Sequence, residues 1–257
     1  EEGGTLDQPI RGDVALTNVS LSYGEKQVLR NVSFSVRAGS RVAIIGPTAA
    51  GKSQLLALLA GLIAPTTGSI QIDGEDVAAY NPSALRGQMG IVFQESLLFQ
   101  GTLRENIAFS QYATEDSINL ALRVAELETF VNELPEGIET SIAERASTLS
   151  GGQKQRLMLA RALAGSPKIL LLDDFTARVD VQTEERILRN IAEAYPGLTS
   201  ISVTQKVATA AAFDQVILLM EGEVLAAGTH EELLQRSPEY AQIVQSQQSV
   251  SLYESTH

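Results

Sequence analysis

Apolar and polar positions in the first third of the chain alternate with the period of two that is typical of β-strands. Val32, Phe34 and Val36 alternate with serines, and residues 14–21 carry a similar pattern. Further along, Asp73-Gly74 follows another alternating run and is typical of a tight hairpin turn. These patterns predict strands and a hairpin before residue 80.

Three other runs are almost continuously apolar, which is typical of strands buried inside a sheet. They cover residues 41–45, 91–93 and 168–172, and residues 201–204 are predicted to form a further strand. Between the second and third runs, from residue 103 to about 135, the apolar period becomes helical. On this pattern Ile118, Leu122, Ala125 and Glu126 share one helix face. The pattern predicts a helical insert between strands of the core.

A glycine-rich loop separates the strand at residues 41–45 from an apolar helix pattern that begins near Lys52. The loop comprises Gly46, Pro47, Thr48, Ala49, Ala50, Gly51, Lys52 and Ser53, and Gln54 follows it. It matches G-x-x-x-x-G-K-[ST] between a strand and a helix, as that motif requires. Its glycines let successive N–H groups point inward as an anion nest, and the helix start adds its positive dipole end. We expect Lys52 to reach the β- and γ-phosphates of a nucleoside triphosphate and Ser53 to hold Mg²⁺.

Two carboxylates end the buried strand at residues 168–172. Asp173 is placed to hold Mg²⁺ or its water shell opposite Ser53. Asp174 lies where a carboxylate could polarise an attacking water. The alternative is that such an Asp only caps a helix, which a pair of carboxylates downstream of a phosphate loop disfavours.

A second stretch has the form of a helix N-terminus shaped for an anion. It comprises Ser150, Gly151, Gly152 and Gln153, which follow Leu149. Serine is a good N-cap, and the glycines allow close approach to an anion. The alternative is simply a capped helix after a loop.

Tyr23 and Gln94 each fit two roles. Tyr23 stands at a strand end, where it either belongs to the core rim or stacks on a purine ring. Gln94 ends the buried strand at residues 91–93, where parallel sheets bind their ligands. The alternative is that the Gln94 side chain has no ligand and that its amide forms hydrogen bonds with the loop backbone.

Composition narrows the class of protein. The chain has 257 residues, 44% of them apolar and only 5% aromatic, which suits an aliphatic α/β core. It has no cysteine, which excludes disulfides and thiol chemistry. No apolar run approaches the ~18 residues needed to span a bilayer. The net charge of −12 argues against binding along a nucleic-acid backbone or to anionic lipid.

Together these motifs resemble the nucleotide-binding domain of ATP-binding-cassette (ABC) transporters, from about Val14 to Ile243. Residues 149–153 match the signature of that family. The resemblance implies an α/β fold: a P-loop NTPase core with a mostly parallel sheet, an N-terminal antiparallel β lobe and an inserted α-helical lobe at about 95–165. It implies ATP and Mg²⁺ as cofactors, with Tyr23 on the adenine and Gln94 in the Mg²⁺ shell.

The resemblance also implies partners. Family members work as head-to-tail dimers in which each ATP lies between one chain's phosphate loop and the other chain's signature. Asp180 matches the loop that crosses the dimer interface, and Gln94 matches a contact to the membrane domain. Residues 94–107 look like the exporter form of this segment. So does Glu144-Arg145, although Ala143 and Ala146 stand where exporters usually carry glycines.

Exporters normally fuse a transmembrane domain ahead of the ATPase. We therefore expect residues 1–12 to be a linker from such a domain, residues 13–245 the nucleotide-binding domain, and residues 246–257 a polar tail. The complex would lie at the cytoplasmic face of a membrane.

Two positions depart from the family pattern. The general base is normally a Glu directly after the strand Asp, and this chain has Asp174. The loss of one methylene draws the carboxylate back by ~1.5 Å, and a misplacement of about that size can cost on the order of a hundredfold in rate. The switch residue is normally a His, and this chain has Gln205, which donates a hydrogen bond but carries no positive charge.

This combination resembles one half of a heterodimeric exporter. Its own phosphate loop would form a slow, ATP-holding site, and its signature would complete the site of a partner chain that carries Glu and His. The first alternative is a homodimeric exporter ATPase in which Asp174 and Gln205 suffice. The second, a family member acting on DNA or ribosomes, would call for coiled-coil insertions, a second cassette or a basic face, so we expect no nucleic-acid partner.

Overall fold

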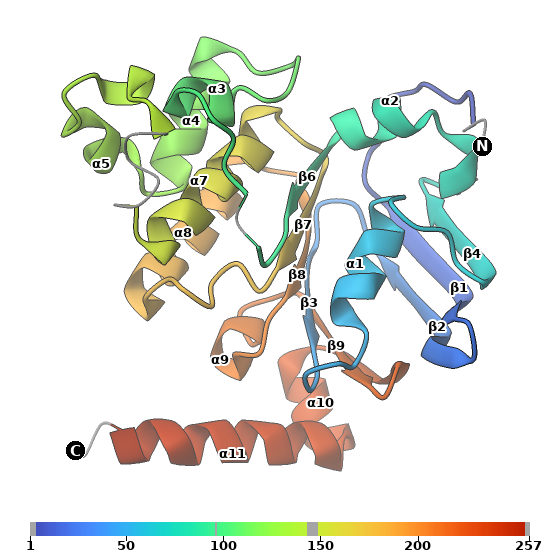
Figure 1. Cartoon of the computed structure of the whole chain (residues 1–257). Coiled ribbons are helices and arrows are strands. Elements are labelled where there is room, and N and C mark those ends of the chain that lie inside the picture. The colour runs from blue at the N-terminus through green and yellow to red at the C-terminus, as the bar shows by residue number, and fades with distance from the viewer. Residues whose placement is uncertain (1–3, 96, 143–148, 255–257) are drawn as a thin grey trace.

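Two sheets form the framework of the computed structural model, which describes residues 4–95, 97–142 and 149–254 (Figure 1). The first sheet is antiparallel, with the strand order β2-β1-β4-β5. Its strands are β1 (Val14–Tyr23), β2 (Lys26–Val36), β4 (Thr67–Ile72) and β5 (Glu75–Asp76).

The second sheet has the strand order β10-β9-β3-β8-β7-β6, and every pairing except β10 with β9 is parallel. Its strands are β3 (Arg41–Ile45), β6 (Met89–Val92), β7 (Ile169–Asp173), β8 (Thr199–Val203), β9 (Gln215–Met220) and β10 (Glu223–Gly228). The mostly parallel core and the N-terminal antiparallel lobe are therefore both confirmed.

Helices cover the sheets and build the third part of the fold. They are α1 (Lys52–Leu59), α2 (Pro82–Gly87), α3 (Leu103–Ile107), α4 (Glu115–Val124), α5 (Glu128–Asn132), α7 (Gly151–Ala164), α8 (Val181–Ala194), α9 (Val207–Ala210), α10 (His230–Arg236) and α11 (Pro238–Glu254), with 3₁₀ turns η1 (Val77–Ala79) and η2 (Gly137–Glu139). In Figure 1, α3, α4, α5, α7 and α8 gather on the left, whereas α1 lies on the other side of the parallel strands. This gathering confirms the helical lobe.

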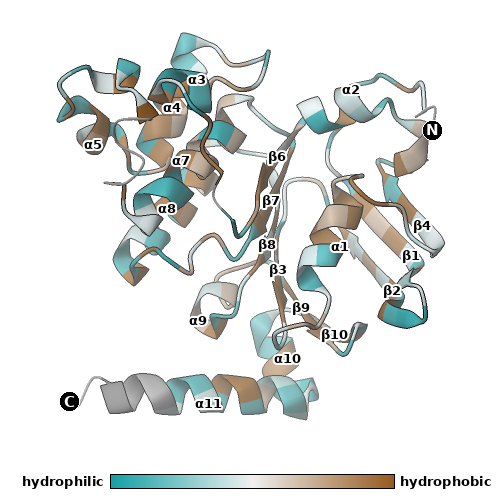
Figure 2. Ribbon diagram, viewed as in Figure 1, coloured by the Kyte–Doolittle hydropathy of each residue, from teal (hydrophilic) through white to brown (hydrophobic). Residues whose placement is uncertain are grey.

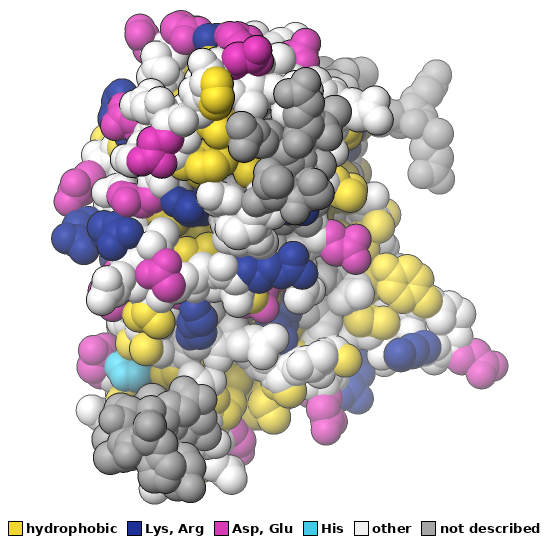
Figure 3. Space-filling model, turned by 60° about the vertical axis from the view of Figure 1, so that its left-hand side comes forward, with side chains coloured by type: hydrophobic (Ala, Val, Ile, Leu, Met, Phe, Trp, Pro, Cys, Tyr) yellow, Lys and Arg dark blue, Asp and Glu magenta, His cyan; other side chains and the backbone are white. Residues whose placement is uncertain are grey.

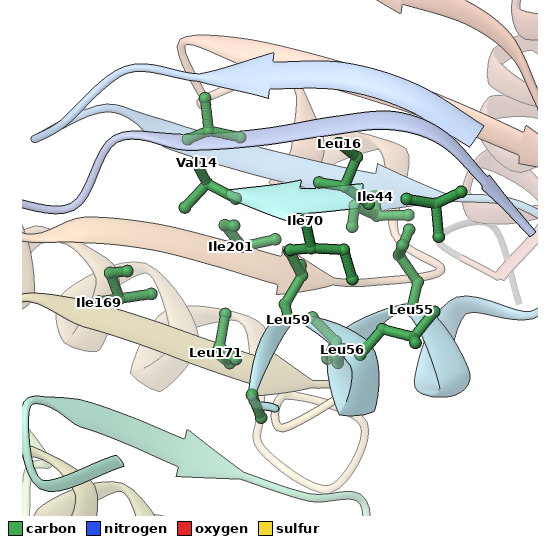
Figure 4. Close-up of a cluster of buried hydrophobic side chains, with 14 of the residues drawn as sticks. Val14, Leu16, Ile44, Leu55, Leu56, Leu59, Ile70, Ile169, Leu171 and Ile201 are labelled. Carbon is green, nitrogen blue, oxygen red and sulfur yellow. The ribbon is translucent and has the colours of Figure 1, made fainter. Parts of the chain in front are cut away.

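Helix α1 fills the space between the two sheets (Figure 4). Its Leu55, Leu56 and Leu59 are buried and belong to one core cluster with residues of both sheets. The labelled sheet residues are Val14, Leu16, Ile44, Ile70, Ile169, Leu171 and Ile201. Burial of each leucine contributes about 1.5–3 kcal/mol. The helix is therefore fixed in place, and so is its N-terminus.

Hydropathy along the ribbon follows this arrangement (Figure 2). The strands of the parallel sheet are hydrophobic, and the exposed turns of the helical lobe are hydrophilic. On the face that Figure 3 brings forward, acidic and basic side chains are interspersed, so charge is not segregated there.

The helical insert is more broken than its periodicity predicts. Helix α4 ends at Val124, and Glu126 has φ 57°, in the left-handed region. Glu126 therefore does not continue the helix face of Ile118 and Leu122, because a left-handed residue cannot belong to an α-helix. Its carboxylate instead accepts hydrogen bonds from Arg186 and Asn190 of α8.

Both ends of the described chain are more ordered than the sequence predicts. Residues 4–12, expected as a linker, contact the domain: Ile10 is 3% exposed and Leu6 pairs with Tyr80. Residues 246–254, expected as part of a polar tail, continue helix α11. The division into linker, domain and tail stays a prediction. Among the described residues, none of the helices combines the length and the hydrophobicity needed to traverse a bilayer.

Candidate nucleotide-binding site

The predicted catalytic and phosphate-binding segments meet at one edge of the parallel sheet. Strands β3, β8 and β7 are adjacent and parallel, with Ile44 opposite Val203 and Val203 opposite Asp173. Strand β8 ends at Val203, β7 ends at Asp173, and β3 ends at Ile45, one residue further on. Asp174, the segment at Thr204 and the glycine-rich loop therefore follow at the same edge of the sheet. The carboxyl edge of a parallel sheet is where such folds bind ligands.

The loop at residues 46–53 lies so close to neighbouring residues that its two glycines have no room for a side chain. A Cβ on Gly46 would lie 1.9 Å from the carbonyl oxygen of Leu219. Gly51 has φ 95°, and a Cβ there would lie 2.6 Å from Leu29. Gly51 is also the N-cap of α1 and provides no side-chain cap. The first N–H groups of α1 therefore remain available to an anion.

Lys52 lies on the inner side of this loop. Its side chain is largely buried, and Nζ donates to the carbonyl oxygens of Gly46 at 2.9 Å and Pro47 at 2.7 Å. Burial lowers the pKa of the ammonium, while the nearby carboxylates of Asp173 and Asp174 oppose that shift. A cation held this way is positioned to transfer its hydrogen bonds to a phosphate.

Asp173 and Ser53 lie close together at the sheet edge, near enough for the Ser53 hydroxyl to influence the pKa of the Asp173 carboxyl. Asp173 is 5% exposed, and burial raises the pKa of its carboxyl, while Ser53 and Lys52 lower it. A hydroxyl and a carboxylate are hard oxygen donors of the kind that Mg²⁺ binds together with phosphate oxygens. The donor set thus fits a Mg²⁺–nucleotide complex.

Asp174 follows in the left-handed conformation, with φ 47°. Aspartate tolerates that region better than most residues, and its backbone N–H donates to the carbonyl of Val203 at 3.0 Å. Burial and the neighbouring Asp173 raise the pKa of the Asp174 carboxyl, and Lys206 opposes the shift. A raised pKa makes this carboxylate a stronger proton acceptor than an exposed one.

Gln205 follows β8 and has an exposed side chain. The next residue, Lys206, points elsewhere: Nζ lies 2.5 Å from Glu184 Oε2 and 3.2 Å from the carbonyl oxygen of Thr176. Glu184 is 2% exposed and also accepts a hydrogen bond from Thr209 at 2.6 Å. The positive charge beside Gln205 is therefore already paired.

The structure leaves the roles of Tyr23 and Gln94 as predictions. Tyr23 ends β1 and is 55% exposed, so its ring is free to contact a ligand. Gln94 is exposed, and its carbonyl oxygen accepts a hydrogen bond from Gln155 Nε2 at 2.9 Å. Gln155 lies on α7, is 1% exposed and has a buried Oε1 without a partner among the described residues. It links the loop of Gln94 to the signature helix, a contact that sequence reasoning did not identify.

The predicted second anion site forms a separate cavity. Ser150 caps α7 by accepting a hydrogen bond from Gln153 N, and Gln153 Oε1 accepts one from Ser150 N, which confirms the cap. The cavity measures about 440 Å³ and is lined by Ser150, Gly151, Gly152, Arg156, Arg178, Val179, Asp180 and Thr183. No residue of the loop at 46–53 lines it.

Asp180 serves as the N-cap of α8, accepting a hydrogen bond from Thr183 N at 2.9 Å. That bond lowers the pKa of its carboxyl. Glu144 and Arg145, which look exporter-like, and Ala143 and Ala146, which depart from the exporter pattern, all lie outside the described residues.

Comparison with known proteins identifies the class to which this fold and site belong. A family model described as ABC transporter matches residues 29–177. The chain is 43% identical over 249 residues to "Uncharacterized ABC transporter ATP-binding protein YfiB" of Bacillus subtilis (strain 168), covering 96% of this chain and 43% of that protein. It is 37% identical over 243 residues to the mitochondrial potassium channel ATP-binding subunit of Rattus norvegicus. That match covers 93% of this chain and 34% of that protein.

Among solved structures, the chain is similar to a bacterial Atm1-family ABC exporter with ATP bound. The TM-score is 0.89 at 37% identity, over 96% of this chain and 43% of that chain. The chain thus spans well under half the length of these relatives. It belongs to the ABC transporter family and is an ATP-binding domain of that family.

Proposed function

We propose that this chain is the ATP-binding module of a membrane exporter and that its own site holds Mg-ATP but hydrolyses it slowly. The observation that carries the proposal is a contrast at one sheet edge. Lys52, Ser53 and Asp173, which would bind Mg-ATP, are all present, whereas the two catalytic positions carry the shorter Asp174 and the uncharged Gln205.

Binding is assigned to the loop and its neighbours. The loop N–H groups and Lys52 would bind the phosphates, Ser53 and Asp173 would hold Mg²⁺, and Tyr23 would stack on the base. Bound Mg²⁺ would supply charge neutralisation to the phosphate oxygens. Gln94 would complete the Mg²⁺ shell, since its side chain is exposed beside β6.

Hydrolysis is weakened for two physical reasons. The carboxylate of Asp174 is a stronger base because of its burial, but it reaches ~1.5 Å less far than a glutamate would. Gln205 can donate a hydrogen bond but cannot offset charge on a phosphate. Lys206 cannot supply that charge while it is paired with the buried Glu184.

The signature is proposed to act on a second chain. The cavity at Ser150, Gly151 and Gly152 has the form of an anion site, yet it lies apart from this chain's own phosphate loop. A nucleotide bound by a partner chain, one that carries Glu and His at the catalytic positions, would fill it. Asp180 lies in the same cavity and would approach the partner there.

The membrane domain is assigned a groove next to Gln94. The groove measures about 730 Å³ and is lined by exposed apolar residues that include Phe93, Leu97, Phe99 and Tyr112. The guanidinium of Arg161 lies 4.8 Å from the ring centre of Phe99, and burial lowers its pKa to about 10. The relatives extend well beyond the part that this chain covers. The occupant we propose is a segment of the exporter's membrane domain, and the module would then lie at the cytoplasmic face of the membrane.

A double variant tests the catalytic part of the proposal. Asp174→Glu together with Gln205→His restores both groups while leaving Lys52 and the signature untouched. If two copies associate with ATP, the variant should turn over on the order of a hundredfold faster than the original chain. The original chain should bind Mg-ATP and stay below about 0.1 s⁻¹, well under the usual enzyme range. Equal rates for the two associated chains would contradict the proposal.

A further inference from the structure

The backbone of the segment that carries Gln205 is held by the C-terminal helix. The side chain of Gln247, on α11, bridges two backbone groups of this segment. Its Oε1 accepts a hydrogen bond from Val207 N at 2.9 Å, and its Nε2 donates one to the carbonyl oxygen of Gln205 at 2.6 Å. In addition, Val244 of α11 is buried in the same core cluster as Val207.

The bridged groups have few other partners within their own segment. Val207 begins α9, and the first N–H groups of a helix have no acceptor inside that helix. The N-cap residue, Lys206, makes no side-chain cap, and its own N–H donates to Thr204 Oγ1 at 3.1 Å. Gln247 therefore supplies, from a distant part of the chain, the cap that the local sequence lacks.

These contacts leave one group of the segment uncommitted. The backbone is held by Gln247, the Lys206 ammonium is held by Glu184, and the exposed side chain of Gln205 has no hydrogen bond to any described residue. We infer that Gln247 is a positioning residue that fixes the segment at 204–207 and so directs the Gln205 amide toward the terminal phosphate of a bound nucleotide. This inference rests on the proposed function, in which the loop at 46–53 binds ATP.

The expected consequence is a change in nucleotide preference. ATP carries the phosphate that Gln205 would contact, and ADP lacks it. Loss of a hydrogen bond to a charged group weakens binding by about tenfold or more. Gln205→Ala should therefore lower the preference for an ATP analogue over ADP by about tenfold, and Gln247→Ala should lower it by several-fold without touching the nucleotide.

The experiment compares four forms of the full chain: the original, Gln247→Ala, Gln205→Ala and the double variant. Affinities are measured for Mg²⁺ complexes of a β,γ-imido analogue of ATP and of ADP. Gln242→Ala is the matched control, because Gln242 is exposed on the same helix and its side chain makes no hydrogen bond to the described residues. Amide hydrogen exchange at Val207, without nucleotide, gives a second readout.

Three results are expected together. Val207 exchanges faster in Gln247→Ala than in the control, the preference for the ATP analogue falls, and the double variant is no worse than Gln205→Ala alone. The last result is the non-additivity expected of residues that act through one group.

Other results overturn the inference. An unchanged preference in Gln247→Ala, beside a reduced one in Gln205→Ala, refutes the role of Gln247 while the proposed function stands. A lower melting temperature with an unchanged ratio of the two affinities would show a merely structural contact. Additive losses in the double variant would show that Gln247 acts independently of Gln205. If the original chain binds neither nucleotide, the proposed function fails and this inference fails with it.

Discussion

Replacement of Lys52 by alanine isolates the binding role of the loop at residues 46–53. The Lys52 ammonium is buried and already held by two carbonyl oxygens of the loop. A bound phosphate would replace these neutral acceptors with charged ones, and charge-assisted hydrogen bonds contribute about 1.5–3 kcal/mol. The variant should therefore bind Mg-ATP roughly 10- to 150-fold more weakly.

Thermal unfolding converts this loss into a temperature shift. A ligand at 100 times its Kd stabilises a protein by about 2.7 kcal/mol. For a chain of about this size, 1 kcal/mol corresponds to roughly 2–4 °C, so the original chain should gain about 5–11 °C with ATP. If the variant binds about 100-fold more weakly, the same ATP concentration only equals its Kd, and the gain falls to about 1–2 °C.

The assay is a melting curve with and without Mg-ATP. Lys168→Ala is the control, because Lys168 is exposed and precedes β7 at the opposite edge of the sheet. The control should keep the full shift. A Lys52→Ala chain that melts cooperatively and still gains the full shift would refute the assignment of phosphate binding to this loop.

Three further substitutions test separate parts of the site. Ser53→Ala should weaken ATP binding by about tenfold with Mg²⁺ and hardly at all with EDTA, as titrations in the two buffers would reveal; equal losses would argue against a metal role. Asp174→Asn should raise the melting temperature at pH 7, because burial and Asp173 raise the pKa of Asp174 and its ionised form costs stability above that pKa. The cost disappears as the pH falls through the raised pKa toward 3.8, so a gain that grows on acidification would contradict this explanation. Gly46→Ala should destabilise the chain by about 1–3 kcal/mol, because the new Cβ would meet the Leu219 carbonyl oxygen. Denaturant unfolding measures this loss, and an unchanged midpoint would contradict the prediction.

Local chemistry explains why the sequence predicted the core of the site. The glycine spacing around Lys52 defines a loop by itself, and the carboxyl ends of parallel strands must meet at one edge. The sequence alone therefore places Ser53 and Asp173 together. The hairpin at Asp73 and Gly74 is equally local, since both residues adopt positive φ as its turn requires.

Contacts that depend on distant packing could not be found in the same way. Gln247 lies in a polar stretch without a clear apolar period, so nothing local links it to the segment of Gln205. From the sequence, Gln155 is only one of several polar residues in a capped helix. In the structure its side chain donates a hydrogen bond to the backbone of Gln94. Glu126 fits the helical period but lies beyond the end of the helix, and its carboxylate is bound by residues of α8, some 60 positions further along the chain.

The central claim is that this chain holds ATP at its own loop and catalyses at a partner's loop through its signature. Single-turnover hydrolysis in a mixture tests it most directly. The original chain is mixed with a copy that carries Asp174→Glu, Gln205→His and Gly152→Ala, the last change placing a Cβ 2.7 Å from the Arg178 carbonyl within the signature cavity. We expect each chain alone to be slow and the mixture to be on the order of a hundredfold faster. A mixture no faster than the sum of its parts, or rapid hydrolysis by the original chain alone, would contradict the account.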